Sequence, residues 1–185
     1  GELETKQMMP SSENNSGFRI LVVDDDPNEM RSLVIGLRLE GFEAHGVSSG
    51  ADALHALTES EYHAVLIDLM MPQMNGLQLA REIRSAHAQV MTILMSAYHL
   101  SPIQLARAKT GVVGFVPKPF CFEELVRFIH TKLDPNAEAP SLSVPFLSEA
   151  GLNAPIDIAQ VLHDTHAPLR LREQFEVPFG KHLFE

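Results

Sequence analysis

The sequence predicts an α/β fold in which a doubly wound sheet of five parallel strands is covered by helices on both faces. Short apolar runs rich in β-branched residues alternate five times with segments whose apolar residues recur at helical spacing. The runs are almost continuously apolar, which is typical of parallel strands buried on both faces. Strands and helices that alternate along a chain form right-handed βαβ units, so we expect all five strands in one sheet.

The predicted elements follow one another from residue 18 to residue 133. The strands are expected at residues 18–23, 42–47, 64–68, 90–95 and 112–116. The helices are expected from Pro27 to just before Gly41 and then at residues 49–60, 76–87, 102–109 and 122–133.

Two of these helices carry detailed signals. Asp26 is the expected N-cap of the first helix, with Pro27 at its first position and Glu29 placed for a capping box. In the third helix, helical spacing predicts an inward face. Its residues are Leu79, Ile83 and Ala86.

The length of 185 residues suits one well-filled domain with additional segments better than two full domains. We expect that domain at residues 18–133. Residues 1–17 are polar and predict a disordered or loosely held tail. Residues 134–155 have the Pro, Asn, Ser and Ala content of a linker. Apolar residues then recur at helical spacing from residue 156, so residues 156–185 are predicted to be a short helical extension or the lead-in to an effector domain.

Composition excludes several function classes. The formal net charge is −10, from 14 basic and 24 acidic residues, which disfavours nucleic-acid binding by this segment. No apolar stretch approaches the roughly 18–20 residues of a membrane span, so we expect no membrane association. Cys121 is the single cysteine, which excludes an intrachain disulfide and fits the reducing cytoplasm.

Polar side chains follow four of the predicted strands at the point where each strand ends. Asp24 and Asp25 follow the first strand, Asp68 ends the third, Ser96 follows the fourth and Lys118 follows the fifth. Ligands of doubly wound sheets bind beyond these carboxyl ends, so we expect the five side chains to form one site. Converging carboxylates repel one another and require a divalent cation, and oxygen ligands favour Mg²⁺ or Mn²⁺.

A cation, a carboxylate, a hydroxyl and a fixed ammonium together suit phosphoryl transfer, which depends on positioning and on neutralisation of spread charge. Asp68 would be the nucleophile and would form an aspartyl phosphate. Lys118 would pair with one phosphate oxygen, and the Ser96 hydroxyl would donate to another.

Four motifs follow one another along the chain and read I-L-V-V-D-D-D-P, V-L-I-D-L-M-M-P-Q-M-N-G, I-L-M-S-A and V-P-K-P-F. In this order and spacing they resemble the receiver domain of bacterial two-component response regulators. The resemblance covers residues 18–133 and implies a flavodoxin-like sheet with strand order 2-1-3-4-5. It also implies that the chain is a phosphoacceptor signalling domain and not an enzyme with an external product.

The resemblance assigns a role to each residue of the expected site. Asp68 is the phosphoacceptor and a metal ligand, and Asp24 and Asp25 are the acidic pair that binds Mg²⁺ or Mn²⁺. The Met70 backbone carbonyl is a further metal ligand, and Lys118 pairs with the phosphoryl group.

Two further residues match the switch of the family. Ser96 matches the switch hydroxyl, and Phe115 matches the aromatic residue that turns inward on activation. The Lys118–Pro119 bond is expected to be cis. The implied partner is a sensor histidine kinase or a phosphotransfer protein. A homodimer is implied either through the face from the fourth to the fifth helix or through the arm after residue 133.

An alternative from another class fits part of the pattern. Asp24 and Asp26 also match the D-x-D start of phosphatases of the haloacid-dehalogenase type, which use an aspartate nucleophile. That alternative leaves Asp68 without a task. Within response regulators the output is open between control of transcription by an effector domain and a stand-alone regulator that acts by protein–protein binding.

Overall fold

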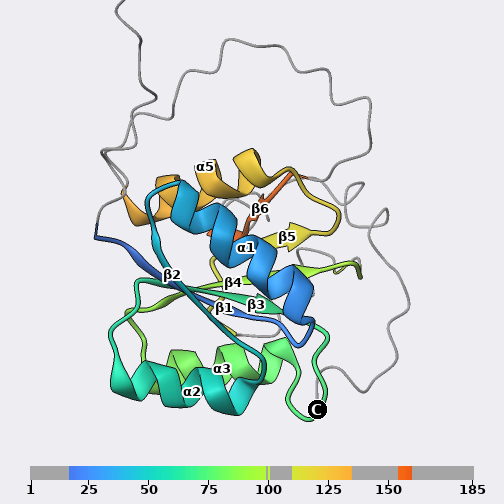
Figure 1. Ribbon diagram of the computed structural model, residues 1–185. Coiled ribbons are helices and arrows are strands. Elements are labelled where there is room, and N and C mark those ends of the chain that lie inside the picture. Colours follow the sequence, from blue (N-terminus) through green and yellow to red (C-terminus); the bar gives the residue numbers. More distant parts are fainter. Residues whose placement is uncertain (1–16, 99, 101–109, 135–153, 160–185) are drawn as a thin grey trace, which may run out of the picture.

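The computed structural model describes residues 17–98, 100, 110–134 and 154–159, which form one sheet between two layers of helices. The six strands have the order β2-β1-β3-β4-β5-β6. Helices α1 and α5 cover one face of the sheet, and α2 and α3 cover the other (Figure 1). The predicted parallel order 2-1-3-4-5 with helices on both faces is therefore confirmed.

The strands are short and the helices have 10 to 13 residues. The strands are β1 Arg19–Val23, β2 Glu43–Val47, β3 Ala64–Asp68, β4 Met91–Ser96, β5 Gly114–Pro117 and β6 Ile156–Asp157. The helices are α1 Pro27–Leu39, α2 Gly50–Glu59, α3 Gly76–Ala86 and α5 Phe122–Leu133.

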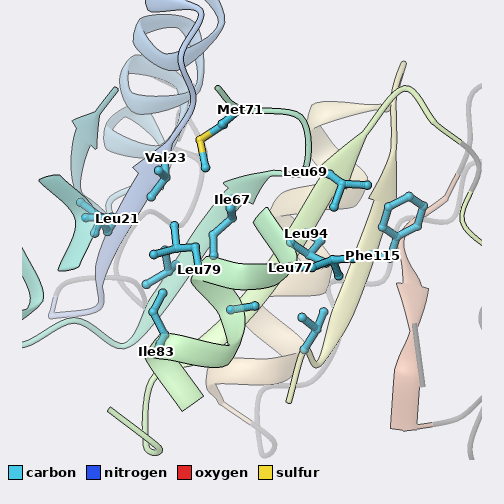
Figure 2. Close-up of a cluster of buried hydrophobic side chains, with 14 of the residues drawn as sticks. Leu21, Val23, Ile67, Leu69, Met71, Leu77, Leu79, Ile83, Leu94 and Phe115 are labelled. Atoms are coloured by element: carbon cyan, nitrogen blue, oxygen red, sulfur yellow. The ribbon is translucent and has the colours of Figure 1, made fainter. Parts of the chain in front are cut away.

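The apolar runs of β1 and β3 lie in the middle of the sheet, where both faces are covered. All five residues of β3 are buried, as are four of the five in β1. One hydrophobic cluster fills the space between the sheet and α2 and α3, where Ile67 meets Leu79 and Ile83 (Figure 2). A second cluster lies under α1 and α5. Each fully buried Leu or Ile contributes about 1.5–3 kcal/mol, so these two clusters stabilise the sheet and the helices packed on it.

The start of α1 confirms one sequence prediction and corrects another. The Asp26 side chain caps the helix by accepting hydrogen bonds from the amides of Asn28 and Glu29. The predicted capping box does not form, because the Asp26 amide donates to Asp24 Oδ1 at 2.9 Å instead of to the Glu29 carboxylate. A capping box is found at α3, between Asn75 and Gln78.

The predicted inward face of α3 is correct for Leu79 and Ile83 and wrong for Ala86. Ala86 is exposed because it is the last residue of the helix, beyond the part that packs on the sheet. The fifth strand begins at Gly114, two residues later than predicted. The predicted helix at residues 102–109 lies outside the described residues.

The structure adds a sixth strand to the predicted five. Helical spacing predicted a helix from residue 156, but Ile156 and Asp157 form β6, which pairs antiparallel with β5. Helical conformation starts only at Ile158. The predicted tail, most of the linker and the remainder of the extension lie outside the described residues. In the parts of the chain that are described, no helix combines the length and the hydropathy of a membrane span.

Candidate functional site

The carboxyl ends of the central strands bring acidic side chains from β1 and β3 together. Asp24 and Asp25 directly follow β1, and Asp68 is the last residue of β3. Carboxylate oxygens of these three residues all lie within 4.8 Å of one another. Asp24 and Asp68 are buried, with exposed fractions of 1% and 9%, while Asp25 is exposed. The sequence correctly predicted that these residues share one site.

Lys118 reaches this cluster from the end of β5. Its Nζ lies 3.5 Å from Asp24 Oδ2 and 3.5 Å from Asp68 Oδ1. The same ammonium makes a closer contact with Glu29, a half-exposed residue in the first turn of α1. Sequence reasoning missed Glu29 because it treated this residue as a helix cap. The backbone amide of Lys118 donates to the Ser96 carbonyl at 2.8 Å, which fixes the end of β5 against β4. The Lys118–Pro119 bond is cis, as predicted.

The charges of the site are incompletely balanced. Burial raises the pKa of the Asp68 carboxyl to about 6, although the ammonium of Lys118 acts against the rise. Burial also raises the pKa of Asp24, against the hydrogen bond from the Asp26 amide and the charge of Lys118. Burial lowers the pKa of Lys118, but the hydrogen bond to Glu29 and the charges of Asp68 and Asp24 outweigh it, so this pKa is raised.

These properties fit a hard divalent cation. Three carboxylates converge, and one ammonium shared with Glu29 does not restore the ordinary acidity of Asp24 or Asp68. A cation beside these oxygens would favour their ionised forms. Oxygen ligands of this kind suit Mg²⁺ or Mn²⁺. Met70, whose carbonyl is a predicted ligand, is 45% exposed in the loop that follows Asp68.

The two predicted switch residues lie on the neighbouring strands β4 and β5. Ser96 is buried at the end of β4, and its Oγ accepts a hydrogen bond from the Tyr98 amide at 3.0 Å. Phe115 is 1% exposed and belongs to the cluster that includes Leu77 and Leu94 (Figure 2). The aromatic ring therefore already occupies an inward position.

Ionisation of Asp68 is expected to destabilise the metal-free protein. Because its pKa is about 6 in the folded protein against the ordinary 3.8, the folded state keeps this proton to higher pH than the unfolded state. The free energy of unfolding that depends on Asp68 therefore falls as the pH rises from about 4 to about 6 and above. In EDTA at about pH 7, we expect Asp68→Asn to raise the free energy of unfolding by about 2 kcal/mol.

Urea denaturation of both proteins measures this difference, which should shrink as the pH falls and vanish only well below about pH 4, where Asp68 is protonated in the unfolded state as well as in the folded one. A difference that does not change with pH would contradict the prediction, as would a variant less stable than the unchanged protein at neutral pH.

Residues 20–130 match the family model of the response regulator receiver domain, a stretch that contains all of the site. The chain belongs to the response regulator receiver family. Receivers are phosphorylated on an aspartate and act as signalling domains, so the haloacid-dehalogenase alternative no longer has support. Membership in the family implies a histidine kinase as partner.

Curated relatives that are similar to this chain include a regulatory protein and a DNA-binding response regulator. It is 37% identical over 107 residues to the regulatory protein AtoC of Escherichia coli, a match that covers 58% of this chain and 23% of AtoC. It is 37% identical over 123 residues to the DNA-binding response regulator MtrA of Mycolicibacterium smegmatis, covering 66% of this chain and 54% of MtrA. The chain thus spans about half or less of the length of these relatives.

Solved receivers share the fold. The response regulator protein TrrA of Thermotoga maritima, crystallised in complex with Mg²⁺ and BeF, is 35% identical with a TM-score of 0.57. The match covers 63% of this chain and 99% of TrrA. A CheY-like receiver of Methanospirillum hungatei gives a TM-score of 0.60 at 24% identity, covering 64% of this chain and 94% of that one, and so supports the fold alone.

Proposed function

We propose that Asp68 is the phosphoacceptor of this receiver and that Asp24, Asp25 and Asp68, with the Met70 carbonyl, hold Mg²⁺ or Mn²⁺. The observation that carries this proposal is the position of Asp68. It ends the central strand β3, with a carboxylate oxygen within 4.8 Å of the acidic pair and 3.5 Å from the ammonium of Lys118. TrrA, whose crystal structure contains Mg²⁺ and BeF, supports the choice of cation.

The proposed reaction transfers a phosphoryl group from a phosphohistidine of the kinase to Asp68. The N–P bond of the donor breaks as an O–P bond to Asp68 Oδ forms, and the histidine nitrogen keeps the bonding electron pair. When bound, the cation neutralises charge on the phosphoryl oxygens. Lys118 leaves the carboxylates and pairs with a phosphoryl oxygen, and the Ser96 hydroxyl donates to another. A cavity of about 750 Å³ lies next to the site and is lined by residues that include Glu29, Lys118 and Phe122.

Phosphorylation of the full chain by acetyl phosphate and Mg²⁺ tests the assignment. We expect intact-protein mass spectrometry to show one added phosphoryl group. Asp68→Asn should abolish it, because the amide oxygen of asparagine is a poor nucleophile compared with a carboxylate. Asp52→Asn, which changes an exposed carboxylate at the start of α2, is the matched control and should keep the label.

Mapping of the label decides between carboxylates. A phosphoryl group on Asp24, or a label that survives in Asp68→Asn, would contradict the proposal. Omission of Mg²⁺ should strongly reduce the label in the unchanged protein if the carboxylate cluster needs the cation.

We propose that Ser96 and Phe115 convert the phosphoryl group into a change of surface. At present the Ser96 Oγ accepts a hydrogen bond from the Tyr98 amide. After phosphorylation, the Ser96 hydroxyl would lose this bond and donate one to a phosphoryl oxygen. The neighbour of Ser96 across the β4–β5 ladder is Pro117, which lies two residues from Phe115. A shift of Ser96 would therefore also displace the end of β5 near Phe115. Such a change shifts the population between two conformations of the receiver, because the contacts with the phosphoryl group stabilise one of them.

The output that we favour is control of transcription, because AtoC and MtrA are named as regulators and extend well beyond the matched region. A stand-alone regulator that acts by protein–protein binding is the second candidate. A homodimer would use the face from the fourth to the fifth helix or the arm after residue 133. A cytoplasmic location agrees with the single cysteine.

A further inference from the structure

The outer edge of β5 is occupied by a segment from far along the chain. In β6, Ile156 pairs with Phe115 and Asp157 pairs with Gly114 in antiparallel register. The pairing extends one step further, because the Ile158 amide donates to the Val113 carbonyl at 3.2 Å. Without this segment β5 would be the edge strand of the described sheet, with unpaired backbone groups.

Side chains anchor the segment on both sides of this ladder. Asp157 Oδ2 lies 2.6 Å from Nζ of Lys132 on α5, and its other oxygen accepts the Ala159 amide at 2.9 Å. Ile158 is 5% exposed and belongs to the same hydrophobic cluster as Phe115. The segment therefore buries an apolar side chain and pairs its only charge, which is how a specific docked strand differs from a chance contact.

The receiver surface is shaped to receive this strand. A Cβ on Gly114 would lie 2.3 Å from Cζ of Phe128, so only glycine allows this ring to lie against β5. The Lys132 ammonium lies 5.6 Å from the centre of the Phe128 ring. The Phe128 ring, the Lys132 ammonium and Asp157 therefore lie together beside Gly114 at the outer edge of β5.

The docked strand is also connected to the phosphorylation site. Phe115 is the partner of Ile156, and Lys118 follows three residues later on the same chain segment. The Lys118 amide is bonded to the Ser96 carbonyl on the opposite side of β5. Fixing β5 from its outer edge therefore restrains the inward ring of Phe115 and the start of the Lys118 loop together.

We propose that residues 154–159 are an intramolecular clamp that docks on β5, holds Phe115 inward and favours the arrangement of the site that binds a phosphoryl group. The coupling to the site rests on the proposed function of Asp68, whereas the docking itself does not. Because coupling between two sites is reciprocal, a phosphoryl analogue bound at Asp68 strengthens the clamp by the same factor by which the clamp strengthens binding of that analogue.

Charge reversal in the full chain tests the docking. Asp157→Lys places two cations together, and we expect the Ile158 amide to exchange its hydrogen at least about tenfold faster. The double variant Lys132→Asp/Asp157→Lys restores the ion pair with its charges swapped and should recover most of the protection. Ile158→Ser, which removes the buried apolar group but no charge, should also accelerate exchange.

Titration with beryllofluoride and Mg²⁺, followed by intrinsic or attached fluorescence, tests the coupling. Asp157→Lys should weaken the apparent affinity about threefold or more, and the charge-swapped double variant should recover it. In the unchanged protein, beryllofluoride should slow exchange at Ile158 by a comparable factor.

Each failure has its own pattern. Rapid exchange of the Ile158 amide in the unchanged protein would overturn the clamp without touching the proposed function. Protection that grows with protein concentration would overturn docking within one chain, because a second copy would then supply the strand. Equal beryllofluoride affinity in all variants would overturn the coupling. Absence of beryllofluoride binding in every variant would overturn the proposed function and the coupling with it, while the exchange data would still decide the docking.

Discussion

Lys118→Ala is expected to slow phosphorylation of Asp68 by acetyl phosphate by about two to three orders of magnitude. The ammonium is the only cationic group that the described residues bring within 4 Å of Asp68, and the transferred group spreads its charge over several oxygens. Removing it also removes the charge that keeps the pKa of Asp68 from rising further, so a smaller fraction of this carboxyl is ionised at neutral pH. The rate of mass increase after mixing with acetyl phosphate and excess Mg²⁺ measures the loss.

A second measurement separates this electrostatic role from damage to the fold. Because the Lys118 ammonium lies 3.5 Å from Asp24 and from Asp68, its removal should strengthen Mg²⁺ binding by the variant, measured by calorimetry. Arg31→Ala, which removes an exposed cation from α1, is the control and should leave both quantities unchanged. Weaker Mg²⁺ binding together with slow phosphorylation would indicate a distorted site and contradict the electrostatic explanation.

The core of the site could be predicted from sequence because charge and burial oppose each other along each strand. An apolar run that enters a covered sheet must end before or at its first carboxylate, so Asp24 and Asp68 mark the strand ends. Parallel strands then bring all such ends to one edge. The same reasoning placed Lys118, since this residue directly follows the last parallel strand, Gly114–Pro117.

The role of Glu29 could not be predicted, because it depends on contacts that helix rules do not describe. Asp24 takes the Asp26 amide that a capping box would have given to Glu29, and this leaves the Glu29 carboxylate to Lys118, 89 residues away. One signal in the sequence could have revealed this arrangement. Asp24 lies two residues before the N-cap and competes with Glu29 as acceptor for the Asp26 amide.

The sixth strand was missed for a different physical reason. Ile156, Asp157 and Ile158 alternate apolar and polar residues, which is the period of a strand, but three residues also fit the helical spacing that continues after them. What decides between the two is the partner surface, which consists of the β5 edge, the Phe128 ring packed on Gly114 and the cation of Lys132. None of these is visible in the local sequence.

Gly76→Ala is expected to lower the free energy of unfolding by about 2–3 kcal/mol and to impair phosphorylation. A Cβ at this position would lie 2.7 Å from the Asp68 carbonyl oxygen and 2.8 Å from the Leu69 Cα. Both neighbours are backbone atoms of the strand end that carries Asp68, and the Gly76 amide is bonded to the Leu69 carbonyl at 2.9 Å. The methyl group can be accommodated only if α3 and the end of β3 move apart.

Gly46→Ala is the matched control, because its new Cβ would also be crowded, at 2.7 Å from Met30 Cγ. Here the neighbour is a flexible side chain at a partly covered surface, so rotation of Met30 relieves the contact and the change should stay below about 1 kcal/mol. Urea denaturation of both variants measures the free energies, and acetyl phosphate labelling measures the site. If Gly76→Ala were as stable as Gly46→Ala, the end of β3 could move to accommodate the methyl group. The explanation that α3 packs rigidly against the strand end that carries Asp68 would then be wrong.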